Sequence, residues 1–350
     1  MSGAGRCGLV LLLAGLACCA AGPGAQLPTH HGEEGFRNPY VERKKTSPLA
    51  YWRMRWFGDV EFPDPEEAKG KIPVVAADLE RIRQPAGPPQ VTWIGHATVL
   101  IQYRGVNVLT DPIFSERASP VSFAGPKRLT PPALTVGQLP RIDFVVISHN
   151  HYDHLDRPSV RALGDGPRWL VPLGLKAWFA KAGIDPARVE EFDWWQERRF
   201  GELTVTATPV QHWSARSPWD RYETLWAGWA LQIGNFSAWF TGDTGYNEHQ
   251  FREIGERLGP FDLALLPIGA YAPRWFMQEV HINPEEAVRI HRDVRARHSI
   301  GIQWGGFILT AEPVDEPPRE LAAARRKLGI AESEFETLKV GETRVLGVGR

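Results

Sequence analysis

Four side chains able to bind a metal ion lie within six residues of this sequence, namely His149, His151, Asp153 and His154. They come directly after the continuous apolar run 142–147, which is typical of a buried strand. Neutral imidazole and carboxylate are good ligands for zinc and similar ions. An H-x-H-x-D-H run at the end of a strand can send His149 and His151 to one ion, and Asp153 and His154 to another.

Two more candidate ligands also follow apolar strands. His212 comes after the alternating run 203–210, and Asp243 lies just past the run 237–241. A carboxylate such as Asp243 can bridge two divalent ions, and two ions that share a water lower its pKa toward neutrality. The resulting hydroxide attacks phosphorus or a carbonyl carbon, so no side-chain nucleophile is needed. A lone His or Asp is more often structural, but positions at strand ends beside an existing cluster favour a functional site.

These side chains require strands that end at a common edge. We expect strands at 99–102 and 106–109, joined as a hairpin, and at 142–148, 169–172, 203–210, 225–233, 237–241, 262–267 and 300–304, with a final strand pair within 335–346. Helices are expected at 175–182, 250–258 and 319–328, and after the cap residue Asn283. Blocks of strands with helices between some of them predict an α/β fold with two sheets and outer helices.

The chain divides into three parts. Residues 1–25 read as a signal segment, because Arg6 precedes an apolar run, 9–21, that is too short to span a bilayer. All three cysteines lie in this part, and Cys19 offers a partial match to a lipoprotein cleavage site. We therefore expect an exported, periplasmic or membrane-associated protein. Residues 26–90 form a Pro-rich lead-in whose aromatic cluster, 51–57, is expected to pack on the core. The hydrolase domain is expected at 91–350.

Composition excludes a global electrostatic attraction to nucleic acid, because the formal net charge is −1. The fourteen tryptophans suit either an aromatic core or an apolar ligand, and the core is the favoured interpretation for most of them. A G-x-S-x-G nucleophile motif does not occur in the sequence. A metal-activated water is therefore the expected attacking group.

The motifs resemble those of the metallo-β-lactamase superfamily, and within it the family of N-acylphosphatidylethanolamine-hydrolysing phospholipases D. The likeness covers roughly residues 90 to 345. The matching stretches are TWIGHAT at 92–98, DPIFS at 111–115, GPKR at 125–128, HNHYDHLD at 149–156, WW at 194–195, QHW at 211–213, GDTGY at 242–246, PIGAY at 267–271, PRWFM at 273–277, and His281 with NPEEA at 283–287.

The resemblance implies an αββα sandwich that binds two zinc ions and cleaves a phosphodiester bond of a phospholipid. It further implies a membrane-surface partner and a homodimer, without nucleic acid. By this likeness His149, His151 and His212 hold the first ion, Asp153 and His154 hold the second, and Asp243 bridges them. Three residues take catalytic roles: Asp153 at the second ion, His281 near the substrate phosphate, and Tyr152 at the substrate entrance.

One departure bears on the second ion. The family pattern places a metal-binding His in the stretch IHWGTF, whereas this chain has Gln303 in IQWGGF at 302–307. An amide oxygen is a weaker zinc ligand than imidazole, so the second ion is expected to bind less tightly, to be a different metal, or to be absent. The alternatives are a hydrolase of a β-lactam, lactone or thioester, and a relative whose catalysis is weakened by Gln303.

The remaining histidines receive structural interpretations. His96 is expected to pack beside the site and to orient a metal ligand. His291 and His298 are expected on the surface of a helix and a turn. His30 and His31 are expected in a mobile part of the lead-in.

Overall fold

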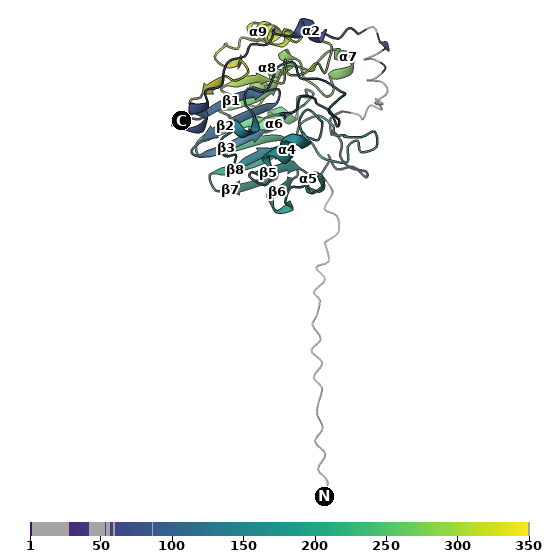
Figure 1. Cartoon of the computed structure of the whole chain (residues 1–350), viewed down its shortest axis with the longest axis vertical. Coiled ribbons are helices and arrows are strands. Elements are labelled where there is room, and N and C mark those ends of the chain that lie inside the picture. Colours follow the sequence, from purple (N-terminus) through teal and green to yellow (C-terminus); the bar gives the residue numbers. More distant parts are fainter. Residues whose placement is uncertain (2–27, 42–52, 54–56, 59, 86, 349–350) are drawn as a thin grey trace.

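Two seven-stranded sheets and a set of helices make up the computed structural model of the chain (Figure 1). The structure describes residues 28–41, 60–85 and 87–348, together with residues 1, 53, 57 and 58. Both sheets are mixed, with antiparallel strands on one side and parallel strands on the other. This architecture confirms the predicted αββα sandwich.

The first sheet carries the loop with the metal-ligand cluster. Its β1, β2 and β3 form an antiparallel meander, whereas β4, β5 and β6 run parallel to β3. In spatial order its strands are β14 (Thr343–Val345), β1 (Gln90–Gly95), β2 (Thr98–Tyr103), β3 (Val106–Thr110), β4 (Phe144–Val146), β5 (Arg168–Pro172) and β6 (Val189–Phe192).

The second sheet repeats this plan. Strands β7 to β10 pair antiparallel, and β11, β12 and β13 continue the sheet in parallel. In spatial order its strands are β13 (Phe335–Thr337), β12 (Ser299–Ile302), β11 (Leu263–Pro267), β10 (Phe236–Phe240), β9 (Gly228–Ile233), β8 (Leu203–Thr208) and β7 (Glu197–Phe200).

The longer helices follow strands in the parallel halves of the sheets. Helix α8 begins with a capping box, in which Asn283 and Glu286 each accept a backbone N–H of the other. The helices are α2 (Pro65–Ala68), α3 (Leu79–Arg83), α4 (Arg157–Leu163), α5 (Lys176–Ala182), α6 (Gln250–Arg257), α7 (Arg274–Met277), α8 (Pro284–Asp293) and α9 (Glu316–Leu328), with 3₁₀ turns at Val136–Gln138 and Pro186–Arg188.

Alternating side chains divide the core of the first sheet into two layers. Val99 and Ile101 belong to the large cluster shared with the second sheet, whereas Leu100 between them belongs to the cluster under the outer helices. Successive residues of a strand point to opposite faces, so one strand feeds both layers. Among the described residues, five tryptophans are fully buried. Trp229 Nε1 donates to the carbonyl of Ile147 at 2.9 Å, just before the metal-ligand loop.

The predicted strand pair within 335–346 is wrong as a pair. Strand β13 adds to β12 in the second sheet, whereas β14 adds to β1 in the first. Each three-residue strand completes the edge of a different sheet, and the chain crosses between them through a turn at Gly341, whose φ is 93°. Local turn signals indicate a hairpin but do not specify which sheet edge each strand meets.

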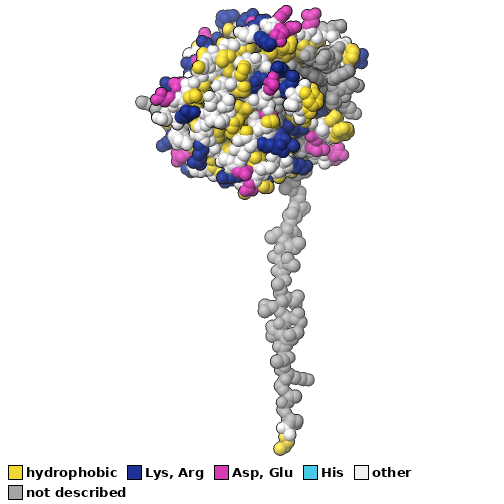
Figure 2. Space-filling model, viewed as in Figure 1, with side chains coloured by type: hydrophobic (Ala, Val, Ile, Leu, Met, Phe, Trp, Pro, Cys, Tyr) yellow, Lys and Arg dark blue, Asp and Glu magenta, His cyan; other side chains and the backbone are white. Residues whose placement is uncertain are grey.

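The described residues include only part of the N-terminal region. The signal segment lies outside the described residues, as does most of the aromatic cluster 51–57, of which Phe57 is 72% exposed. Within the described ranges, no helix combines the length and apolar character needed to cross a bilayer. On the face seen in Figure 2, basic and acidic side chains are interspersed, as expected for a net charge of −1.

Four of the histidines given structural interpretations are more constrained than predicted. His30 and His31 are held by Asp193 rather than lying in a mobile lead-in. His291 is buried, not on the surface: it stacks on Phe335, and its Nδ1 lies 2.8 Å from Ser299 Oγ. It shares the buried face of α8 with Ala287 and Val288, the helical spacing that places a residue toward the core. His298 is partly buried and pairs with Glu336 at 3.0 Å.

His291 makes the stability of the fold depend on pH. Burial lowers the pKa of His291 from 6.5 to about 4, so the unfolded chain gains a proton at this residue before the folded chain does. The stabilising contribution is complete above pH 6.5 and is lost as the pH falls toward 4, at about 1.4 kcal/mol per pH unit.

We expect His291→Gln to flatten the decline in unfolding free energy between these pH values, as measured by urea denaturation. His249→Gln, at an exposed histidine, is the control, and equal slopes for wild type and His291→Gln would contradict this assignment.

Candidate metal centre

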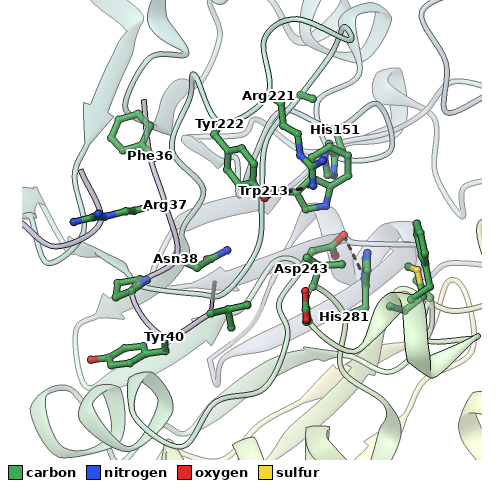
Figure 3. A pocket seen from close by; sticks show the side chains of 18 of the residues that line it. Phe36, Arg37, Asn38, Tyr40, His151, Trp213, Arg221, Tyr222, Asp243 and His281 are labelled. Carbon is green, nitrogen blue, oxygen red and sulfur yellow. Dashed lines mark hydrogen bonds and ion pairs between the residues drawn. The ribbon is translucent and has the colours of Figure 1, made fainter. Parts of the chain in front are cut away.

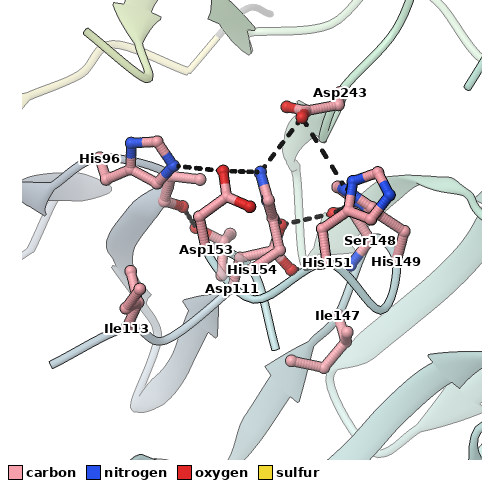
Figure 4. A network of polar contacts seen from close by, with 12 residues as sticks. His96, Asp111, Ile113, Ile147, Ser148, His149, His151, Asp153, His154 and Asp243 are labelled. Carbon is pink, nitrogen blue, oxygen red and sulfur yellow. Dashed lines mark hydrogen bonds and ion pairs between the residues drawn. The ribbon is translucent and has the colours of Figure 1, made fainter. Parts of the chain in front are cut away.

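The predicted ligands meet where the ends of several strands converge. His149, His151, Asp153 and His154 lie on the loop that follows β4, whereas His212 follows β8 and Asp243 follows β10 (Figure 4). Gly242 allows the close approach of the two sheets here, because a Cβ at this position would lie 2.3 Å from Cβ of Ser148. Its φ of 64° is one that glycine adopts without strain.

The first group of facing atoms comes from three histidines. Nε2 of His149 lies 2.8 Å from Nδ1 of His151, which lies 3.3 Å from Nε2 of His212. Oδ2 of Asp243 lies 3.8 Å from the His149 nitrogen and 3.7 Å from that of His212. These four residues offer ligand atoms that all lie within 4.8 Å of one another.

The second group lies on the other side of Asp243. Nε2 of His154 sits between two carboxylates, 3.2 Å from Oδ2 of Asp153 and 3.3 Å from Oδ2 of Asp243. Nε2 of His96 lies 3.0 Å from Oδ2 of Asp153. His96 therefore occupies the orienting position expected of it, and Asp243 contacts both groups.

Hydrogen bonds to the rear of three rings determine which nitrogen faces the centre. His212 donates from Nδ1 to the carbonyl of Val280 at 2.8 Å, and His154 donates from Nδ1 to Asp111 at 2.7 Å. Ser148 Oγ donates to Asp111, so it accepts from Nδ1 of His149 at 2.9 Å. The Nε2 atoms of His149 and His212 are thereby left without that proton and directed inward, as hydrogen bonds behind metal-binding histidines do. Nε2 of His154 also faces inward, toward the carboxylates of Asp153 and Asp243.

Asp111 and Ser148 were not predicted as site residues. Their carboxylate and hydroxyl fix the rings of His149 and His154 from behind. The position of Asp111 could have indicated a role in the site, because it directly follows strand β3. Asp243 likewise lies just past a strand, two residues beyond the end of β10. The motif DPIFS at 111–115 contains Asp111 but does not by itself indicate that its carboxylate contacts the metal ligands.

The charges of the site fit a bound cation. Burial lowers the pKa of His149 and His212 well below 6.5 and that of His151 to about 4, so these rings are neutral. Burial alone lowers the pKa of His154, but the carboxylates of Asp243 and Asp153 outweigh it and raise that pKa well above 6.5. A positive charge is thus stabilised between the two carboxylates.

The geometry also fits metal ions. Ligand atoms about 2.0–2.1 Å from one tetrahedral ion lie roughly 3.3–3.4 Å apart, close to the distances within both groups. Among the described residues, none supplies a hydrogen-bond partner to the buried Oδ1 of Asp243 or to Nε2 of His151. A buried polar atom without a partner costs about 1–3 kcal/mol, which a cation bound to Asp243 would remove.

Three further predicted residues are His281, Tyr152 and Gln303. Nδ1 of His281 lies 3.8 Å from Oδ2 of Asp243, and its ring faces the cavity. Tyr152 lines the cavity, but its hydroxyl donates to the carbonyl of Arg216 at 2.8 Å. Gln303 is buried, and within the described part of the chain neither side-chain heteroatom has a hydrogen-bond partner. Its amide oxygen is therefore unoccupied by a hydrogen bond, and Gln303 lines a small separate cavity together with His96.

A cavity of about 1620 Å³ opens onto Tyr152 and His281, whereas Gln303 does not line it (Figure 3). His151, Asp153, Asp243 and His281 contribute to its polar end. Its other walls are largely apolar and include Phe36, Tyr40, Trp213, Trp275, Phe276, Met277 and Leu309. The arrangement joins a cation-binding centre to a space for an apolar group.

Comparison with known proteins places this geometry in a family. Residues 106–304 match the family model described as the Beta-lactamase superfamily domain. The chain is 46% identical over 265 residues to N-acyl-phosphatidylethanolamine-hydrolyzing phospholipase D 1 of Caenorhabditis elegans, covering 72% of this chain and 74% of that protein. It is 39% identical over 242 residues to the mitochondrial N-acyl-phosphatidylethanolamine-hydrolyzing phospholipase D of Saccharomyces cerevisiae. This match covers 67% of this chain and 51% of that protein.

A solved structure shares the fold. The isothiocyanate hydrolase from Delia radicum gut bacteria superposes with a TM-score of 0.59 at 20% identity, covering 74% of this chain and all of that one. The matched family model spans the strands and loops that bring His149, His151, Asp153, His154, His212 and Asp243 together. The chain therefore belongs to the metallo-β-lactamase superfamily and is a metal-dependent hydrolase.

Proposed function

We propose that this hydrolase cleaves the phosphodiester bond of an N-acylated phospholipid by a phospholipase D-type reaction. The observation that carries the proposal is the 46% identity with the phospholipase of Caenorhabditis elegans over most of both chains. In this reaction the oxygen of a water forms a bond to phosphorus. The bond from phosphorus to the headgroup oxygen breaks, and that oxygen takes a proton.

The cavity agrees with an amphiphilic substrate. Its polar end contains Asp243 and His281, whereas Trp213, Trp275 and Phe276 lie along its walls. Apolar walls stabilise acyl chains by removing them from water, at about 25 cal/mol per Å² of buried apolar surface. A substrate phosphate at the polar end would therefore extend its chains along the aromatic walls.

Each residue of the centre has a definite task in this proposal. His149, His151 and His212 would hold one zinc ion, Asp153, His154 and Gln303 would hold the second, and Asp243 lies beside both sets of ligands. When bound, the ions would lower the pKa of the attacking water and neutralise charge on the phosphate oxygens. Asp153 would accept a proton from that water, and His281, whose Nδ1 lies 3.8 Å from Oδ2 of Asp243, would face the phosphate.

Tyr152 lines the entrance rather than transferring a proton, since its hydroxyl is already bonded to the carbonyl of Arg216. We also propose that the apolar run 9–21 directs export, so that the enzyme meets its lipid outside the cytoplasm. Mass spectrometry of the mature N-terminus tests the export part.

Substrate class is tested by comparing three compounds with the purified, zinc-loaded chain. We expect hydrolysis of bis-p-nitrophenyl phosphate, and faster turnover of N-acylphosphatidylethanolamine in mixed micelles, with phosphatidic acid as the lipid product detected by mass spectrometry. EDTA should abolish both activities, and added zinc should restore them. A preference for nitrocefin over both phosphodiesters would overturn the proposal.

Removing the shared carboxylate tests the roles assigned to the centre. We expect Asp243→Asn to lower kcat on bis-p-nitrophenyl phosphate by at least about a hundredfold, because both ions lose a charged ligand. The thermal unfolding midpoint should change little, since the core strands are untouched. Asp165→Asn, at an exposed carboxylate, is the matched control. Near-normal activity of Asp243→Asn after zinc return would show the assignment to be wrong.

Gln303 generates a prediction in the opposite direction. An imidazole is a better zinc ligand than an amide, so Gln303→His should tighten the more weakly held ion by about tenfold or more. Chelator competition measures this affinity, and the rate on bis-p-nitrophenyl phosphate should rise with it. If neither the ion affinity nor the rate changes, position 303 does not contact an ion.

A further inference from the structure

Residues 28–41, here called the strap, form one wall of the catalytic cavity. Phe36, Arg37, Asn38 and Tyr40 lie along the left side of the view in Figure 3, across the cavity from Asp243 and His281. The strap precedes the hydrolase domain in sequence, yet the same cavity contains both its side chains and those of the metal centre. The width of the cavity therefore depends on where the strap is held.

A partly buried cluster of His30, His31 and Asp193, here called the clasp, holds the beginning of the strap. His30 Nε2 lies 2.6 Å from Oδ1 of Asp193, and His31 Nε2 lies 2.8 Å from Oδ2 of the same carboxylate. A carboxylate only accepts, so both imidazoles donate. His30 also stacks on Trp194 with ring centroids 4.2 Å apart, and Trp194 donates its backbone N–H to Asp193 at 2.8 Å. Each oxygen of Asp193 is thereby satisfied.

The clasp is tied to the rigid part of the domain. Asp193 directly follows β6, the last strand of the first sheet. Burial alone raises the pKa of Asp193, but hydrogen bonds from His30 and His31 hold it below its ordinary value. The carboxylate is therefore ionised, and hydrogen bonds to an ionised acceptor are roughly twice as strong as neutral ones.

The chain from the clasp to the cavity is short and hydrogen-bonded. The backbone N–H of Arg37 donates to the carbonyl of His30 at 2.9 Å, which folds the strap back on itself. Phe36 then donates to the carbonyl of Tyr222 at 2.8 Å. Asn38 donates from Nδ2 to the carbonyl of His212 at 2.8 Å, directly behind a residue of the metal centre. A shift at the clasp would thus reach the cavity wall within eight residues.

We propose that His30, His31 and Asp193 are positioning residues for substrate binding: they fix the strap as a cavity wall and so set the affinity for the acyl part of a lipid. The lipid identity rests on the proposed function, whereas the position of the strap does not. The chemistry at the metal centre is left unchanged by this role, because none of the three lies among the residues that line the polar end of the cavity.

The test compares His30→Ala/His31→Ala with His30→Gln/His31→Gln, whose amides retain donors for Asp193. His298→Ala is the control, because it removes a histidine–carboxylate pair elsewhere. For micellar N-acylphosphatidylethanolamine we expect the alanine pair to raise KM roughly five- to tenfold with kcat within about twofold, and the glutamine pair to recover most of this loss. The kcat/KM for the small bis-p-nitrophenyl phosphate should stay unchanged.

Trypsin reports on the strap without reference to substrate. Cleavage after Arg37, identified by mass spectrometry, should be slow in the wild type, fast in the alanine pair and slow again in the glutamine pair. Equal losses toward the lipid and the small phosphodiester would overturn the proposal, as would an unchanged lipid KM. Loss of a third bound ion in the alanine pair would also overturn it, since a metal would then join the three side chains.

Failure of the proposed function is distinguishable from failure of the clasp. A wild-type chain that hydrolyses no lipid refutes the phospholipase assignment, and the acyl part of this inference falls with it. Protection of Arg37 in the wild type and its loss in the alanine pair would still establish the clasp, and unchanged protection would refute it.

Discussion

Nε2 of His149 and Nε2 of His212 both face Nδ1 of His151, and hydrogen bonds behind two of the rings leave these Nε2 atoms without protons. A single proton on Nδ1 of His151 can serve only one of these two lone pairs well, whereas a cation between the three nitrogens would serve both. The surrounding structure keeps them together: Asp111 and Ser148 hold His149, the carbonyl of Val280 holds His212, and the carboxylate of Asp243 adds negative charge.

Two sheets are needed to build this arrangement. The first sheet supplies the loop after β4, and the second supplies His212 after β8 and Asp243 after β10. Gly242 has no side chain, so the two strand ends can approach each other at Ser148. The indole of Trp229 in the second sheet donates to the carbonyl of Ile147, which follows β4 of the first sheet. The packing between the two sheets therefore sets the distances between the metal ligands.

Much of this was predictable from local pattern. The apolar runs that end at His149, His212 and Asp243 indicate strands whose ends carry ligands, and the hairpins at Arg104-Gly105 and Gly234-Asn235 form as their turn residues predict. Long-range pairing was not predictable in this way. Strands β13 and β14 join different sheets because each pairs with a strand distant in sequence. The contact of His30 and His31 with Asp193 also joins residues that are far apart in the chain. His291 could have been placed in the core from its helical spacing, because it follows Ala287 and Val288 by one turn.

We conclude that the neutral imidazoles and buried carboxylates at this junction bind cations. Elemental analysis of the purified chain, after zinc loading and gel filtration, tests it most directly. The account predicts two zinc ions per chain, with the one nearer Gln303 lost first on dialysis against a weak chelator. A chain that is folded by circular dichroism but retains no divalent ion would contradict the account.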